Sequence, residues 1–108
     1  MNKKNDSGTV KAKKGGVKKS PKITGGDGSS LENALIVTAT DTNDGVSAQK
    51  KYIESQCGEW NKDFLYELQL QINHIEIERH YDLIYVKMIK DKSKREFWFD
   101  VTSFFGKL

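Results

Sequence analysis

The hydrophobic pattern of the chain starts with a continuous apolar run at residues 34–39, which is rich in β-branched side chains. A run of this length between polar residues predicts a strand buried on both of its faces. The polar cluster at residues 40–45 ends that strand. Because the Asp44 carboxylate can accept hydrogen bonds from the free N–H groups of a first helical turn, we expect Asp44 to be the N-cap of a helix.

Residues 45–57 continue with helical periodicity. Four side chains fall at the spacing of one inward-facing helix stripe: Val46, Gln49, Ile53 and Cys57. Gly58 follows at the position where a left-handed residue commonly ends a helix. The pattern therefore predicts a helix over residues 45–57 with one face packed on a core.

Apolar and polar residues then alternate over residues 64–72. Five side chains are predicted to share one face: Phe64, Tyr66, Leu68, Leu70 and Ile72. A period of two over nine residues indicates a strand with one buried face. Leu, Glu and Gln also favour helices, so a helix is the competing interpretation, and we favour the strand.

Two further strands are predicted at residues 81–89 and 96–102, joined by a polar connection at 90–95 whose length suits a hairpin. A tight turn near residues 78–80 precedes them. Residues 103–106 are expected to form a final turn that returns two phenylalanines to the core. The element order is thus β-α-β-β-β.

This order predicts an α+β fold with a mainly antiparallel four-stranded sheet, one helix packed on one face and a disordered N-terminal tail. One helix of this length cannot cover both faces of four strands, and the last two strands carry large apolar residues on both faces. We expect the less covered face to be an interaction face containing Tyr85, Met88 and Trp98. The final turn, a ligand or a second copy of the chain could cover it, which makes a weak homodimer one expectation.

Charge divides the chain into two parts. Residues 1–30 contain eight lysines and two aspartates, a net charge of +6, while residues 31–108 contain ten Lys or Arg and thirteen Asp or Glu, a net charge of −3; together they give the overall +3. The first part has few apolar residues and six of the nine glycines, so it cannot bury enough surface to offset the entropy of ordering. We predict a disordered Lys/Gly-rich tail at 1–30 and a small α+β domain at 31–108.

The tail suggests contact with a polyanion. In composition alone it resembles the basic tails of chromatin and nucleoid proteins. Lysine without arginine supplies point charges that suit phosphates and not base edges, so we expect nonspecific, salt-dependent nucleic-acid binding. The alternative is a solubilising tail with no partner. The lysines concerned are Lys3, Lys4, Lys11, Lys13, Lys14, Lys18, Lys19 and Lys22.

Candidate metal and catalytic residues are few. His74, Glu76, Glu78 and His80 alternate and would share one face of a straight strand, where they could ligate zinc. A solvated strand face with a turn inside it explains the same pattern better, so we predict no metal site. Asp82 and Asp100 could meet as paired carboxylates on neighbouring strands, although Asp100 can also cap the turn that follows it.

Nucleophile and phosphate-loop motifs do not occur in the sequence. The single cysteine, Cys57, excludes an intramolecular disulfide, and its place at a predicted helix end favours a buried core thiol. We therefore predict a protein that is not an enzyme and carries no cofactor.

The remaining features favour the cytoplasm and no membrane association. No apolar run reaches the roughly 18 residues of a membrane-spanning helix, and the basic start lacks the apolar stretch of a secretory signal. The leading hypothesis is a small non-enzymatic binding protein whose sheet domain contacts protein and whose tail weakly binds nucleic acid or another polyanion. The alternative is a pure protein–protein interaction module of the inhibitor or immunity type with a passive tail.

Overall fold

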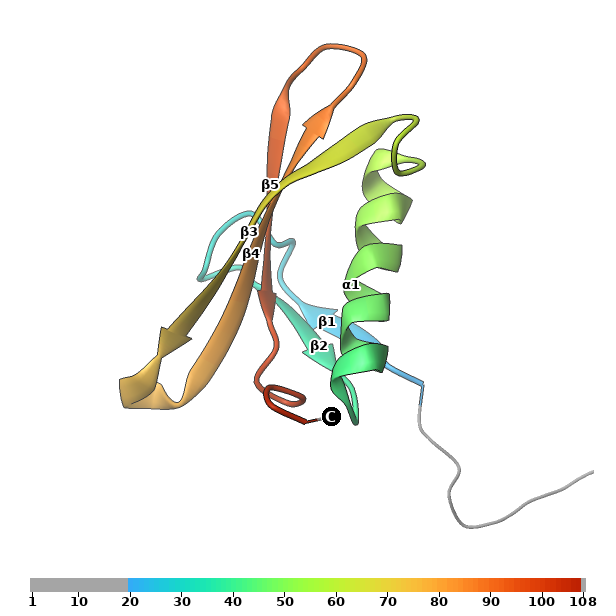
Figure 1. Cartoon of the computed structure of the whole chain (residues 1–108). Helices are drawn as coiled ribbons and strands as arrows, with labels where there is room; N and C mark the ends of the chain where they lie inside the picture. The colour runs from blue at the N-terminus through green and yellow to red at the C-terminus, as the bar shows by residue number, and fades with distance from the viewer. Residues whose placement is uncertain (1–19, 108) are drawn as a thin grey trace, which may run out of the picture.

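The computed structural model describes residues 20–107, which form one helix and one five-stranded sheet (Figure 1). The elements are β1 (Lys22–Gly25), β2 (Leu35–Thr38), α1 (Thr42–Cys57), β3 (Phe64–His74), the short 3₁₀ helix η1 (Ile75–Ile77), β4 (Arg79–Met88) and β5 (Lys94–Asp100). The predicted α+β class with a single helix against one sheet face is confirmed. The sheet has five strands in place of the four that we predicted.

The strand order in the sheet is β1-β2-β5-β4-β3. The last three strands form the predicted antiparallel meander, and β2 joins it by parallel pairing with β5. The α1 crossover between β2 and β3 lies against one face of the sheet (Figure 1). Each end of the sheet is therefore an open strand edge among the described residues, formed by β1 on one side and β3 on the other.

Strand β1 lies inside the region that we predicted to be a disordered tail. It pairs antiparallel with β2, and Ile23 packs against the core. The prediction is therefore wrong for residues 22–25, because backbone pairing with a neighbouring strand stabilises a segment whose own composition does not favour a fold. It is also wrong for residues 26–30, where Gly26 and Gly28 donate backbone hydrogen bonds to the Ala34 and Asn33 carbonyls. Residues 1–19 lie outside the described residues, so the tail prediction is untested there.

Strand β2 is buried on one face only. Leu35 and Val37 are buried on the α1 side, whereas Ile36 is 40% exposed. The prediction of burial on both faces is wrong because the one helix covers a single side of the sheet. An apolar run can thus contain a side chain that faces solvent.

Helix α1 begins three residues earlier than predicted. Asp41 is the N-cap, and its carboxylate accepts a hydrogen bond from the Asp44 backbone N–H at 2.9 Å. The prediction of Asp44 as N-cap is wrong because two aspartates in the cluster suit the role and the sequence does not rank them. The predicted helix end is confirmed: Gly58 has φ +103° and its N–H donates to the Glu54 carbonyl at 2.9 Å.

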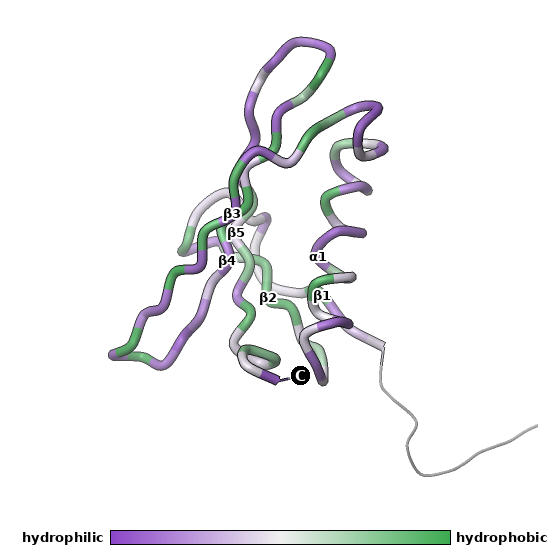
Figure 2. Tube along the Cα trace, viewed as in Figure 1, coloured by the Kyte–Doolittle hydropathy of each residue, from purple (hydrophilic) through white to green (hydrophobic). Residues whose placement is uncertain are grey.

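The main core fills the space between α1 and the sheet. Its buried members include Leu35, Val37, Ile53, Phe64, Ile84, Val86, Phe97, Phe99 and Phe104. Figure 2 shows hydrophobic and hydrophilic residues alternating along the strands, with hydrophilic ones predominating in the connection between β4 and β5. Among the described residues, no helix is both long and apolar enough to cross a membrane.

The final turn folds back as predicted, but its two rings have different neighbours. Phe104 is buried against α1 at Gly45, while Phe105 stacks on the His80 ring with centroids 3.7 Å apart. Phe104 therefore completes the α1 side of the core. It does not cover the opposite face of the sheet, which was one of the roles that we considered for this turn.

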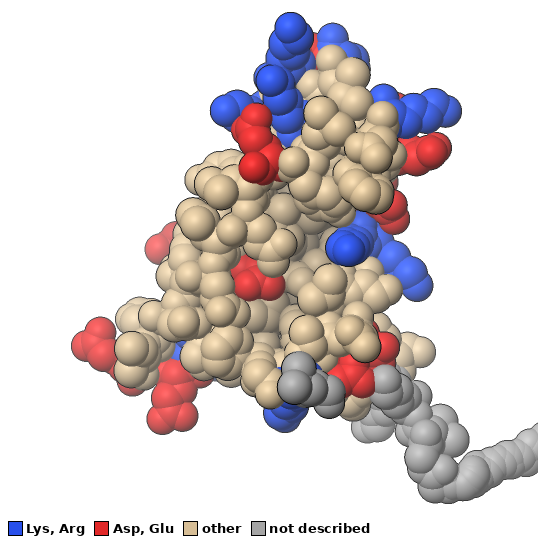
Figure 3. All heavy atoms as spheres, viewed as in Figure 1, with Lys and Arg blue, Asp and Glu red and all other residues tan. Residues whose placement is uncertain are grey.

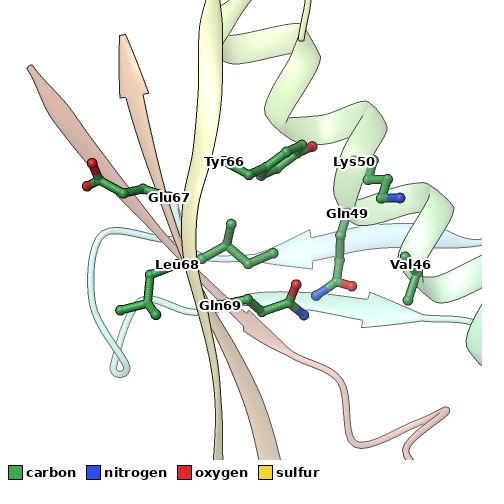
Figure 4. Close-up of a pocket in the computed structure, with 8 residues that line it drawn as sticks. Val46, Gln49, Lys50, Tyr66, Glu67, Leu68 and Gln69 are labelled. Carbon is green, nitrogen blue, oxygen red and sulfur yellow. The ribbon is translucent and has the colours of Figure 1, made fainter. Parts of the chain in front are cut away.

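Strand β3 is confirmed as a strand, but its apolar residues are divided between the two faces. The register with β4 shifts between Tyr66 and Leu68, where Glu67 is the extra residue of a β-bulge. Tyr66 and Gln69 point toward α1, and Glu67 and Leu68 point away from it (Figure 4). The prediction that positions 64 to 72 share one apolar face is therefore wrong, because one inserted residue reverses the alternation that follows.

Candidate functional site

The sheet face opposite α1 contains two of the three residues predicted to form an interaction face. Tyr85 is the cross-strand neighbour of Leu68, and Trp98 is the neighbour of Leu83, so all four lie on that face. Met88 pairs with Phe64 and packs against the α1 core. Its assignment to the interaction face is wrong, because positions 85 and 88 of a regular strand lie on opposite sides.

Leucines of β3 extend this apolar face to the edge of the sheet. Leu68 is 49% exposed and Leu70 is 44% exposed, although both stand on a strand with apolar neighbours. Together with Tyr85 they line a shallow hollow of about 550 Å³ whose rim contains Glu67 and Lys94. These two charged groups form an ion pair at 3.1 Å. We name this surface the leucine face, defined by Leu68, Leu70, Ile72, Leu83, Tyr85 and Trp98.

The leucine face continues to an open backbone edge. Strand β3 has 11 residues and, apart from a bridge between Phe64 and Trp60 at its start, pairs only with β4 in the part of the chain that the structure describes. Residues 68–74 contain no Asp, Glu, Lys, Arg or Pro. Exposed edge strands of soluble proteins are usually protected by such residues. The edge of β3 after its bulge therefore lacks the common side-chain barriers to pairing with another strand.

Charged residues gather mainly at the two ends of the molecule, with fewer between them on the face that Figure 3 shows. Lys and Arg are concentrated at the end formed by the β4–β5 connection, and Asp and Glu at the end formed by η1 (Figure 3). The exposed acidic residues of the η1 end include Glu76 and Glu78. The two ends of the molecule thus differ in the sign of their predominant charge.

The lysines predicted to bind a polyanion lie mostly outside the described residues. Seven of the eight belong to residues 1–19. Lys22 is in β1 and is exposed, opposite Thr38 of β2. The structure therefore shows where the tail joins the fold and leaves its binding role as a prediction.

A cleft with apolar and polar lining residues lies between α1 and β3, on the other face of the sheet from Tyr85 and Trp98 (Figure 4). Its volume is about 370 Å³, and a second cleft of about 460 Å³ adjoins it, since Val46 and Gln69 line both. Gln49 is 1% exposed and Asp82 is 6% exposed, and the Gln49 amide Nε2 donates to the Asp82 Oδ2 at 3.0 Å. Burial raises the pKa of the Asp82 carboxyl, and the hydrogen bond from Gln49 partly opposes that rise.

This polar pair was not predicted as a site. Gln49 occupies an inward position of the helix stripe, and Asp82 interrupts the apolar strand at 81–89. A polar residue at a core position is the signal that could have identified the pair, since burial requires a hydrogen-bond partner. The arrangement offers amide and carboxyl groups to a hydrogen-bonding ligand, at the lower end of the size range of small-molecule pockets.

The four alternating His and Glu residues are not brought together as one group, although His74 Nε2 lies 3.9 Å from Glu76 Oε1. His74 pairs with Arg79 and His80 with Asn73, so the two histidines lie on opposite faces of the hairpin, and η1 interrupts the strand between them. Within residues 20–107 the structure contains no group of three or more His, Cys, Asp or Glu that could hold a metal ion. The two aspartates considered as a pair also face opposite ways, because Asp100 is the cross-strand neighbour of Tyr81.

The contacts of Asp100 and Cys57 indicate structural roles for both residues. The Asp100 carboxylate accepts hydrogen bonds from the backbone N–H and the hydroxyl of Thr102, as expected for a cap of the final turn. Cys57 is buried, and its Sγ lies 3.6 Å from Arg95 Nη1. Burial raises the pKa of the Cys57 thiol, and the Arg95 charge partly opposes this rise. Because the thiolate is the nucleophile, the raised pKa lowers the nucleophilicity of Cys57 at neutral pH.

Comparison with known proteins gives no further guidance: no protein-family model, no curated protein and no solved structure matches this chain. The function of the protein is therefore inferred from its residues and their geometry alone.

Proposed function

We propose that the protein is a non-enzymatic binding protein of the cytoplasm. Its folded domain contacts protein through the leucine face, and its lysine tail adds weak electrostatic attraction to nucleic acid or another polyanion. The observation that carries the proposal is the exposure of Leu68 and Leu70 beside Tyr85, at a sheet edge that no described segment covers. Burial of Cys57 and the capping role of Asp100 support the non-enzymatic part.

The tail is tested by a gel shift with duplex DNA and with RNA. Full-length protein is compared with a variant that lacks residues 1–19, which retains β1 and therefore the whole described sheet. Removal of lysines that contact phosphates releases fewer counterions on binding, so the truncated protein should lose most of its affinity and its dependence on salt. Equal shifts by the two proteins would remove the polyanion role.

A matched variant separates charge from length. Replacing Lys11, Lys13, Lys14, Lys18 and Lys19 by glutamine keeps the tail and its glycines but removes five charges. This variant should behave like the truncation, because phosphate attraction is electrostatic. Binding that survives the charge removal would assign any effect of truncation to another property of the tail.

The acidic η1 end favours one alternative function. An inhibitor or immunity-type module would recognise a basic protein through Glu76, Glu78 and their neighbours, and the tail would be passive (Figure 3). In that case the tail truncation has no effect on binding. Affinity purification would instead recover one basic protein in stoichiometric amount, and Glu76→Gln with Glu78→Gln would abolish its recovery.

A further inference from the structure

The leucines of β3 on the leucine face, Leu68 and Leu70, are exposed because β3 has a strand neighbour on one side only. Side chains of a central strand are covered by neighbours on both sides, but Leu68 and Leu70 have β4 alone beside them. A second strand added to the open edge would place new side chains next to both leucines. It would also give partners to the backbone groups of an 11-residue strand.

We propose that this second strand is β3 of another copy of the chain. The two β3 strands pair antiparallel about a twofold axis at Leu70 and join two five-stranded sheets into one of ten strands. This inference rests on the proposed role of the leucine face in protein contacts. It names a second copy of the chain as the partner that covers the leucine face.

The sequence of β3 is self-complementary in this register. Leu70 meets its own copy at the axis, and Leu68 meets Ile72 on the same face, so every apolar residue of the regular part of the strand gains an apolar neighbour. On the α1 face, Gln69 meets Gln71, and amide side chains can donate and accept hydrogen bonds with each other. No two charged residues are opposed, since residues 68–72 contain none.

The β-bulge and the strand end define the length of the pairing. The register of β3 with β4 is regular from Leu68 to His74, and it shifts on the other side of Glu67. A regular edge of this kind suits backbone pairing, whereas a bulge interrupts it. With the axis on Leu70, residues 68–72 of the two copies pair with one another, and all of them lie within the regular part of the strand.

The charge distribution of the molecule agrees with an antiparallel arrangement. A twofold axis across β3 reverses the second copy, so its basic end approaches the acidic η1 end of the first (Figure 3). Opposite charges at both ends favour this orientation over the parallel one.

A dimer of this kind would present two lysine tails to one polyanion. Binding of the first tail raises the effective concentration of the second, so the dimer should bind a long nucleic acid more tightly than a monomeric variant does. The folded domain and the tail would then serve one activity.

Cysteine cross-linking tests the register directly. In a Cys57→Ala background, Leu70→Cys places two thiols at the axis, within the Cα separation that a disulfide spans. Gln71→Cys is the matched control, because the two copies of residue 71 are displaced along the strands beyond that separation. We expect mild oxidation of the full-length protein to link most of the Leu70→Cys chains and few of the Gln71→Cys chains.

Other results overturn the proposal. Efficient linking by Gln71→Cys with none by Leu70→Cys would contradict the register, and monomer in both variants would contradict the pairing itself. Sedimentation of the full-length protein at high micromolar concentration should show a dimer that Leu70→Lys converts to monomer; a wild-type monomer refutes the dimer without relying on any variant. The gel shift of the tail reports on the proposed function separately, since a monomer that binds polyanion loses only this inference.

Discussion

The packing of Phe104 against Gly45 gives a sharp prediction for Gly45→Ala. Glycine lowers helix stability, so alanine at an ordinary interior position of α1 should stabilise it by about 1 kcal/mol. At position 45, however, an ideal Cβ would lie 2.5 Å from Phe104 Cε1 and from Cε2. The structure therefore predicts the opposite sign from the sequence.

The magnitude follows from the size of that overlap. Carbon atoms in contact are about 3.5–4.0 Å apart, so the ring has to move by roughly 1 Å or more. Phe104 is buried at the end of the α1 core and its turn is held by the hydrogen bond from its backbone N–H to the Val101 carbonyl. Overpacking of such a site costs about 1–3 kcal/mol, and the gain in helix propensity offsets about 1 kcal/mol of it, so we expect Gly45→Ala to lower the free energy of unfolding by up to about 2 kcal/mol.

Urea denaturation of four proteins measures this effect. The wild type, Gly45→Ala, Phe104→Ala and the double variant form a cycle in which the alanine at 45 should be destabilising beside Phe104 and stabilising once the ring is removed. A Gly45→Ala protein more stable than the wild type would refute the packing. It would also allow Phe104 to cover the leucine face instead, which would weaken the proposed function.

Two further measurements test the cap of α1 and the buried pair. Asp41→Ala should lower the free energy of unfolding by about 1 kcal/mol because it removes the N-cap acceptor, and Asp44→Ala, which keeps that acceptor, should cost less; the reverse order in urea melts would contradict the assignment. For Asp82, burial raises the pKa in the folded state above its ordinary value near 4, so the folded protein holds this proton more tightly than the unfolded chain does. The stability that this group contributes is therefore complete below the unfolded-state pKa and is lost as the pH rises through the raised folded-state pKa. Asp82→Asn lacks this titration, so the wild type should lose stability relative to the variant as the pH rises above the ordinary Asp pKa near 4, and parallel stability curves would show that the pKa is not raised.

Local patterns in the sequence were sufficient for the broad architecture. Helical spacing with a glycine after it located the end of α1, and alternation located β3 even though its residues also favour helices. The polar connection after β4 predicted the hairpin to β5. These features depend on neighbours within a few residues, which is why the sequence alone could reveal them.

Tertiary structure decided which surface is available for binding. The bulge at Glu67 reverses the faces of β3, and nothing in a regular alternation announces an inserted residue. Strand β1 exists because β2 offers it a pairing edge, although its own segment is polar and rich in glycine. The burial of Asp82 likewise depends on Gln49, a residue 33 positions away in the chain.

The sequence by itself thus determined the α+β class, the single helix, the antiparallel meander and the separation of positive from negative charge. The fifth strand, the exposure of the leucines and the polar pair beneath α1 emerged only in three dimensions. The physical reason is that periodicity records the local geometry of the backbone, whereas burial depends on which distant segment covers each face. For this protein, the side of β3 on which Leu68 and Leu70 lie carries the functional argument, and one extra residue in the strand determines that side.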